Sequence, residues 1–212
     1  MTWIITFFSL VGLTLAVSAE PQAGQPAPDF TATDINGKTV SLSDYSGKIV
    51  VIEAHDSTCP WTAQEYQSGA IQELQRQLTA AGVIWLILDP GVQTQLHIRE
   101  TPAEAKGEWV SEKMAITDWI IDDTRQSVSK RYGIRVTPQM VVIDKAGIVA
   151  YTGAIDDAQT LDGDRRTAHN YVRQAVTELL AGKDVSVPHV KPFGCMIMYP
   201  GMTQFQLMRP MN

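Results

Sequence analysis

The chain has 212 residues, of which 44% are hydrophobic and 19% are charged, and its formal net charge at pH 7 is −6. These values are typical of a soluble globular protein, and the length suits one domain with a substantial core. The net negative charge and the lack of a long basic run argue against nucleic acid as a partner.

The N-terminal segment has the pattern of an export signal. Residues 1–19 carry no charge, residues 3–17 are apolar, and small residues precede Glu20, as at a signal-peptidase site. We therefore expect residues 1–19 to be a cleaved signal peptide and the folded part to lie in the periplasm or another extracytoplasmic compartment. The alternative is an uncleaved anchor, the only case in which the chain would have a membrane as a partner.

A β-hairpin is predicted next. Residues 29–34 and 38–42 flank an Asn36-Gly37 pair, which is a strong signal for a tight hairpin turn. A connecting loop over residues 43–47 follows.

Two apolar runs predict the centre of a sheet. Residues 49–54 and 83–88 lack the alternation of a half-exposed strand, so we expect both strands to be covered on both faces. Between them, apolar residues recur at helical spacing, which predicts a helix from Pro60 to Gly82 and hence a parallel strand–helix–strand unit.

The second half of the chain continues the alternation of strands and helices. The expected elements are helices over 102–114 and 124–132, a strand over 118–122, a hairpin over 139–153, and a final helix over 168–180. The acidic loop 156–164 lacks the spacing of a calcium loop and is expected to be solvated. The expected organisation is therefore one domain over 20–182, followed by a tail over 183–212 that is rich in Pro and Met, without a clear period and mobile.

Cys59 is the main candidate for chemistry. It follows the first central strand and precedes Pro60, whose missing N–H suits the first position of a helix. Unpaired N–H groups and the positive end of the helix dipole stabilise a thiolate at such a position. Trp61, beside the cysteine, is expected at the site surface as a contact for a protein substrate.

These motifs together resemble the thioredoxin superfamily, and more narrowly the exported redoxin or peroxiredoxin-like proteins of the alkyl hydroperoxide reductase/thiol-specific antioxidant family. The matching motifs run from residue 25 to residue 182: Ala27-Pro28-Asp29-Phe30, Asp34-x-x-Gly37-Lys38, Cys59-Pro60-Trp61-Thr62 and Val136-Thr137-Pro138. The resemblance implies an α/β thioredoxin-like fold: a mixed central sheet flanked by helices, with an N-terminal hairpin and an insertion before the cis-proline loop.

The resemblance also implies roles for site residues. Pro138 would be cis and, with Thr137, would pack its loop against the sulfur of Cys59. Glu53 lies six residues before Cys59, where thioredoxins place an acid, and a buried carboxyl there could accept a proton. We leave open whether Glu53 is buried with a raised pKa or lies on a solvated edge.

Two departures from the family patterns bear on the reaction. Thr62 stands where a thioredoxin has its second cysteine, so the dithiol motif is absent. Peroxiredoxins place Thr or Ser three residues before the reactive cysteine, where this chain has Asp56. The missing hydroxyl favours disulfide exchange over peroxide reduction. Asp56 would oppose a thiolate and a protonated His55 would favour it, so the sign of the net shift stays open.

A single-cysteine site needs a resolving thiol, and Cys195 is the only internal candidate. Three interpretations remain open for it: a resolving cysteine, half of a structural disulfide, or an unrelated free or intermolecular thiol.

The sequence therefore predicts an exported thiol oxidoreductase with Cys59 as nucleophile, acting on disulfides or peroxides and re-reduced by an external thiol, with no organic cofactor or metal. One alternative is a copper chaperone that uses the two cysteines and the tail methionines as soft ligands. Another is a thioredoxin-fold protein that binds partners without turnover.

Overall fold

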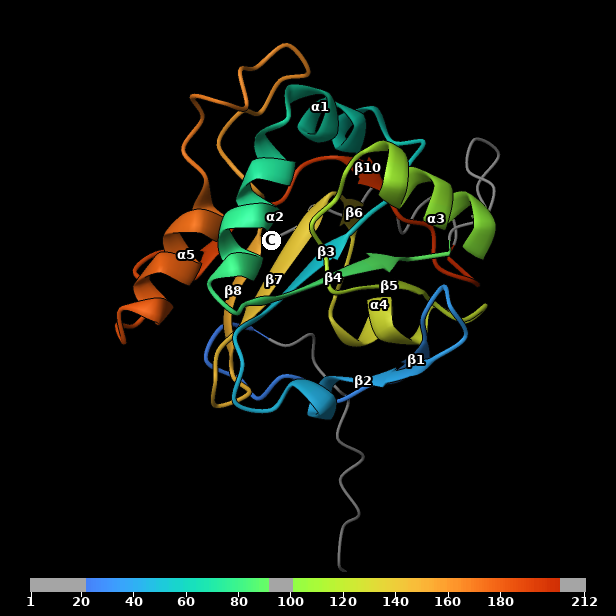
Figure 1. The fold of residues 1–212 in the computed structure, drawn as a ribbon, viewed down its shortest axis with the longest axis horizontal. Helices are drawn as coiled ribbons and strands as arrows, with labels where there is room; N and C mark the ends of the chain where they lie inside the picture. Colours follow the sequence, from blue (N-terminus) through green and yellow to red (C-terminus); the bar gives the residue numbers. More distant parts are fainter. Residues whose placement is uncertain (1–21, 92–100, 203–212) are drawn as a thin grey trace, which may run out of the picture.

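A computed structural model describes residues 22–91 and 101–202 (Figure 1). The segment expected to be a signal peptide, together with Trp3, His97 and the methionines beyond Met202, lies outside the described residues. Within the described part of the chain, none of the helices is both long and apolar enough to cross a bilayer.

The centre of the fold is a six-stranded mixed sheet with the strand order β5-β4-β3-β7-β8-β9. Its strands are β3 (Val50–Ala54), β4 (Ile84–Asp89), β5 (Asp118–Ile121), β7 (Gln139–Ile143), β8 (Val149–Gly153) and β9 (His189–Val190). β3, β4 and β5 are mutually parallel, whereas β7 is antiparallel to both β3 and β8. The two apolar runs are confirmed as central strands, and every residue of β3 is buried.

Successive strand residues point to opposite faces of the sheet, and each face has its own apolar core. Val51, Trp85 and Ile87 pack in one core with side chains of α1 (Pro60–Ser68), α2 (Ala70–Ala80) and α5 (Tyr171–Leu180). Val50 and Leu86 pack in the other core with Val128 of α4 (Ser127–Arg131). The hairpin of β1 (Thr31–Thr33) and β2 (Thr39–Ser41) lies on this second face, and its strands pair antiparallel as predicted (Figure 1).

The helix predicted as continuous from Pro60 to Gly82 is two helices. Gly69 adopts a left-handed backbone conformation with φ of 75°, which ends α1 at Ser68 and starts α2 at Ala70. The spacing of apolar residues is unaffected by such a break, so the helical period did not reveal it.

Further element boundaries differ from the predictions, among them that of the last helix, which begins at Tyr171 rather than at residue 168. The loop expected at 43–47 begins with a 3-10 helix, η1 (Leu42–Tyr45). The helix α3 (Pro102–Ser111) has the predicted Thr101–Glu104 capping box but ends before Met114. The helix expected over 124–132 spans only Ser127–Arg131, because the Asp123 carboxylate accepts hydrogen bonds from the backbone N–H groups of Arg125 and Ser127 and holds this stretch as a turn.

The described part of the tail, residues 183–202, is held by main-chain pairing, although a mobile tail was expected. β9 pairs parallel with β8, and β10 (Cys195–Met196) pairs antiparallel with β6 (Val136–Thr137). These strands are two residues long, too short to show a period, so pattern analysis could not detect them.

The acidic loop is only partly solvated. Asp157, Asp162 and Asp164 are exposed as expected, but Asp156 is buried, and its Oδ1 accepts a hydrogen bond from the backbone N–H of Ala158. The expectation is wrong for Asp156 because the loop folds back onto α1.

Candidate redox site

Cys59 is the N-cap of α1, directly after the turn that leaves β3. Its carbonyl accepts the first hydrogen bond of the helix, from Ala63, and Pro60 occupies the first helical position as predicted. The side chain of Cys59 is 0% exposed, and its Sγ lies 3.0 Å from the carbonyl oxygen of Thr137. The sulfur therefore lies between the start of a helix and the loop that precedes β7.

The Thr137-Pro138 peptide bond is cis, as the resemblance implied. Thr137 ends β6, so the same backbone segment both contacts Cys59 and pairs with the tail. This arrangement brings Cys195, which is opposite Thr137 in the strand register, to Cys59.

Cys59 and Cys195 form a disulfide that joins residues 136 positions apart, with a Cα–Cα distance of 6.0 Å. This pairing removes one of the three interpretations of Cys195, the unrelated free or intermolecular thiol. The two cysteines differ in environment, because Cys59 is fully buried whereas Cys195 is partly exposed.

Aromatic packing and a glycine hold the tail at this site. The Trp61 and Phe193 rings meet edge to face with 5.2 Å between centroids. A Cβ atom on Gly194 would lie 2.7 Å from the carbonyl carbon of Thr137, so only glycine lets the tail approach this closely. Trp61, predicted as a contact for a substrate, thus already packs against the chain's own tail, and neighbouring Thr62 is buried.

Glu53 is fully buried, so the solvated edge left open by the sequence is wrong. Its carboxylate accepts hydrogen bonds from the Tyr66 hydroxyl at 2.9 Å, the Trp85 indole N–H at 2.8 Å and the Gln75 amide at 3.4 Å. These three donors hold the carboxylate among α1, α2 and β4. Its role in proton transfer stays a prediction.

His55 connects Glu53 to a second carboxylate that sequence reasoning missed. Its Nδ1 lies 3.4 Å from Glu53, and its Nε2 lies 2.9 Å from Glu108 of α3. Burial alone would lower the pKa of His55, but its hydrogen bonds to Glu108 and Glu53 and their negative charges raise it to about 10. The ring is therefore an imidazolium at neutral pH. Nothing in the sequence near Glu108 indicated this contact, because 53 residues separate it from His55.

A second buried ion pair fixes the other end of the cysteine helix. Glu65 of α1 pairs with Arg165 of the acidic loop at 2.8 Å, and both side chains are almost fully buried. The next residue, Arg166, donates a hydrogen bond to the carbonyl oxygen of Ser68 at 2.8 Å. The loop 156–170 thereby holds the helix whose first turn carries Cys59.

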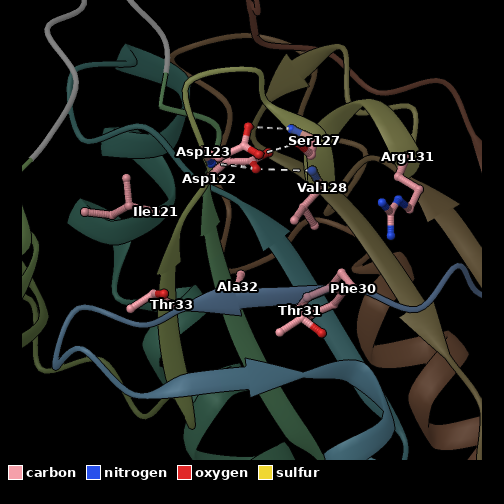
Figure 2. Close-up of a pocket in the computed structure, with 10 residues that line it drawn as sticks. All are labelled: Phe30, Thr31, Ala32, Thr33, Ile121, Asp122, Asp123, Ser127, Val128 and Arg131. Carbon is pink, nitrogen blue, oxygen red and sulfur yellow. Dashed lines mark hydrogen bonds between the residues drawn. The ribbon is translucent and has the colours of Figure 1, made fainter.

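A pocket of about 360 Å³ lies away from the disulfide, between β1 and the turn that joins β5 to α4. Figure 2 shows the carboxylates of Asp122 and Asp123 directed at the start of α4. Asp122 accepts hydrogen bonds from the N–H groups of Val128 and Ser129, and Asp123 accepts one from Ser127. These carboxylates cap the helix, so we assign no chemistry to this pocket.

Residues 23–152 match the AhpC/TSA family. The chain belongs to the AhpC/TSA family. This AhpC/TSA protein is 29% identical over 128 residues to the thiol-disulfide oxidoreductase ResA of Geobacillus thermodenitrificans, a match that covers 59% of this chain and 66% of ResA. It is also 41% identical over 66 residues to mouse glutathione peroxidase 7, covering 31% of this chain and 34% of that protein. The chain therefore spans less than two thirds of the length of each relative.

Solved structures show the same fold. A hypothetical protein of Sinorhizobium meliloti superposes with a TM-score of 0.72 at 23% identity, covering 87% of this AhpC/TSA protein and 98% of its own chain. A thiol:disulfide interchange protein from Bacteroides sp. superposes with a TM-score of 0.54 at 18% identity, covering 76% and 92% of the two chains. The predicted α/β thioredoxin-like fold, with its mixed sheet flanked by helices, is confirmed.

Within residues 22–91 and 101–202, no group of three or more His, Cys, Asp or Glu side chains is arranged to hold a metal ion. Among the residues that the structure describes, the two histidines outside the Glu53 network, His169 and His189, are exposed.

Proposed function

We propose that this protein is an exported thiol–disulfide oxidoreductase in which Cys59 and Cys195 form the redox pair. The observation that carries the proposal is the disulfide between a buried cysteine at a helix N-terminus and a partly exposed cysteine on the tail. The relatives named as thiol-disulfide oxidoreductases support the same reaction. The uncharged segment of residues 1–19 supports export, and a persistent disulfide is expected in an oxidising compartment.

The exposures of the two cysteines favour Cys195 as the point of entry. A thiolate must approach a disulfide along the S–S axis, and Cys59 is fully buried whereas Cys195 is partly exposed. An external thiolate attacks Sγ of Cys195, forms a mixed disulfide there and releases Cys59 as a thiolate. A second external thiolate then attacks the sulfur of the first external thiol in this mixed disulfide. Cys195 is released as a thiolate, the two external thiols leave as a disulfide, and the two-electron reduction of the pair is complete.

Cys59 is the better leaving group because of its position. The free N–H groups and dipole of the α1 N-terminus stabilise negative charge, and a sulfur with a lower pKa leaves faster. Once protonated, the Cys59 thiol can donate a hydrogen bond to the Thr137 carbonyl oxygen. In the oxidising direction the steps reverse: Cys195 attacks the partner's disulfide, and the Cys59 thiolate resolves the mixed disulfide. This assignment exchanges the roles expected from the sequence, where Cys59 was the first nucleophile.

Peroxide reduction is the second candidate, favoured by the match to glutathione peroxidase 7. A peroxide would oxidise the Cys59 thiolate to a sulfenic acid and release the reduced oxygen as water or an alcohol. The thiol of Cys195 would then displace water from the sulfenic acid and form the disulfide. The missing hydroxyl at Asp56 and the full burial of Cys59 make exchange the favoured reaction.

The deciding experiment maps the first mixed disulfide. The oxidised protein is mixed with a limiting amount of glutathione, quenched with acid, alkylated, digested and analysed by mass spectrometry. We expect glutathione on Cys195 and the alkyl group on Cys59. Glutathione found on Cys59 would refute the proposed direction of attack, and no reaction with any thiol would refute the function.

Two companion measurements test the alternatives. Reduced protein treated with one equivalent of hydrogen peroxide should form the disulfide no faster than free glutathione is oxidised if exchange is the reaction. Turnover with disulfide substrates should be insensitive to copper chelators, whereas loss of turnover in their presence would favour the copper-binding alternative.

A further inference from the structure

The loop between β8 and α5 encloses a group of buried charges outside the redox site. Glu65 of α1 and Asp156 and Arg165 of the loop are 2%, 1% and 4% exposed, respectively. We call these three residues the buried charge cluster. It contains two carboxyl groups and one guanidinium, so it carries one excess negative charge when both carboxyls are ionised.

Asp156 lies at the base of this loop. It pairs with Asn170 in an isolated antiparallel β-bridge. Beside it, the backbone N–H of Asp157 donates to the carbonyl oxygen of His169, and the backbone N–H of His169 donates to the Asp157 carboxylate. The base of the loop is therefore closed, and Asp156 is fixed where β8 and α5 approach each other.

Two contacts hold the body of the loop against α1 (Figure 1). Nε of Arg165 lies 2.8 Å from Oε1 of Glu65, and Nε of Arg166 donates to the carbonyl oxygen of Ser68 at 2.8 Å. Nη1 of Arg165 also donates to two carbonyl oxygens of the loop itself. Arg165 therefore joins the internal fold of the loop to its attachment on the helix.

The hydrogen bonding of the cluster is incomplete. Oδ1 of Asp156 accepts a hydrogen bond from the backbone N–H of Ala158 at 2.9 Å, but Oδ2 has no hydrogen-bond partner among the described residues. Nη2 of Arg165 also has none among them. A buried carboxylate oxygen without a donor is unfavourable, whereas a protonated carboxyl carries no charge. The cluster therefore favours the uptake of one proton, which makes it neutral.

The surrounding groups favour the same proton. Burial and the negative charges of Asp156 and Glu53 raise the pKa of Glu65. They outweigh the opposing charge of Arg165, and this pKa reaches about 8. Burial also raises the pKa of Asp156, and the charge of Asp157 adds to this effect, while Arg165 and a backbone hydrogen bond oppose it. At neutral pH the two carboxyls therefore share one proton.

Neighbouring elements do not neutralise the second carboxylate. Glu53 of β3 and Asp157 of the loop add negative charge. The Tyr151 hydroxyl of β8 stays protonated, because burial raises its pKa above the usual range. Arg166 is exposed. Loss of the shared proton therefore leaves an uncompensated negative charge between α1 and the loop.

We propose that the buried charge cluster is a pH-dependent latch. One proton shared by Glu65 and Asp156 keeps the loop 156–170 closed on α1, and loss of that proton in alkaline solution opens the loop and loosens the helix whose N-cap is Cys59. The closed loop binds one proton more than the open loop. Closure is therefore complete below the ordinary carboxyl pKa of 4.5 and is lost as the pH rises through about 8.

Hydrogen exchange measures the opening. The oxidised full-length protein is exchanged at a series of pH values, and each exchange rate is divided into the rate of an unstructured peptide at the same pH to give a protection factor. We expect the protection factors of the loop and of α1 to fall by up to tenfold per pH unit between about pH 5 and pH 8 and then to level off. Those of β4, which report unfolding of the whole domain, should fall less.

Asp156→Asn isolates the second carboxyl. Its amide oxygen can still accept the hydrogen bond from Ala158, but the cluster is now neutral without a proton. We expect loop protection in this variant to be independent of pH over that range and to exceed the wild-type value at least tenfold at about pH 9. Asp162→Asn, which removes an exposed carboxylate from the same loop, is the matched control and should follow wild type.

Glu65→Gln gives the same comparison from the helix side, since it also leaves one carboxylate beside Arg165. It should likewise remove the pH dependence, and it provides the test if Asp156→Asn does not fold. Loop protection that is lost in acid rather than in alkali would identify a plain ion pair and would overturn the proposal. An equal pH dependence in the wild type and in the cluster variants would also overturn it.

The coupling to the cysteine helix has its own outcome. Loop opening that leaves the protection of α1 unchanged would show that the latch does not control the helix, and this would overturn the proposal as well. Because the measurement adds no thiol, its result is independent of the proposed exchange reaction.

Discussion

Single residues with little chemistry of their own determine whether the two cysteines meet. Gly194 precedes Cys195 and lies against the Thr137 carbonyl, and Gly153 lies equally close to the Val190 carbonyl where β9 joins the sheet. Both glycines occupy places where two backbones touch, so a Cβ atom at either position would push the tail away from its site.

Gly194→Ala should weaken the disulfide. Overlap of the new methyl group with the Thr137 carbonyl forces the tail outward, with a penalty of about 1–3 kcal/mol. We expect the equilibrium constant for disulfide formation to fall about tenfold, which corresponds to about 1.4 kcal/mol. It is measured as the fraction of oxidised protein across a series of glutathione redox ratios. Gly107→Ala is the control, because a Cβ there meets open space. Identical redox midpoints for Gly194→Ala and wild type would contradict this account.

At the scale of elements, buried charge pairs connect segments that the sequence separates widely. The His55–Glu108 pair joins the end of β3 to α3, and the Glu65–Arg165 pair joins α1 to the acidic loop. A continuous apolar run predicted β3, and apolar residues at helical spacing predicted the helical stretch that contains α1, because burial leaves such patterns in the sequence. It could not predict the pairs, since a charged residue in a helix is ordinarily solvated.

The His55 network should make stability depend on alkaline pH. Burial alone would lower the pKa of His55, but its bonds to Glu108 and Glu53 raise it from 6.5 to about 10. A group whose pKa is higher in the folded state contributes its full stability below the unfolded pKa and loses it as the pH rises through the folded pKa. We therefore expect the free energy of unfolding to decline between pH 6.5 and about pH 10.

Denaturant unfolding at intervals across this range measures the decline. Glu108→Gln removes one of the two carboxylates that raise the pKa of His55. The total decline in the free energy of unfolding should therefore be smaller and should end at lower pH. Glu73→Gln, which alters an exposed carboxylate on α2, should follow the wild-type curve. If the free energy of unfolding of Glu108→Gln and of wild type declines by the same amount over the same pH range, Glu108 does not stabilise the protonated form of His55.

At the scale of the whole molecule, the disulfide closes most of the domain into one loop. It joins the N-cap of α1 to a strand 136 residues later, and five of the six strands of the central sheet lie within that loop, whereas β3 precedes it. The tail is thus part of the fold as long as the disulfide is intact.

Cys195→Ser should destabilise the oxidised protein strongly. In the chain-entropy model, closing a loop of this length stabilises the folded state by about 4–5 kcal/mol. We expect denaturant unfolding to show this loss for Cys195→Ser relative to oxidised wild type. Reduced wild type should match the variant. Equal free energies for Cys195→Ser and the oxidised wild type would mean that the disulfide only positions the sulfurs.

The sequence by itself determined the central strands and the hairpin, because each depends on local pattern, and the resemblance of its motifs to the thioredoxin superfamily implied the fold and the cis proline. The sequence also placed Cys59 at a helix N-terminus and named Cys195 as its possible partner. Only the tertiary structure decided that the two sulfurs meet, that Cys59 is buried while Cys195 is accessible, and that Glu53 lies inside a network with His55 and Glu108. These outcomes depend on contacts between segments tens of residues apart, and the packing of the folded chain, rather than any local period, brings those segments together.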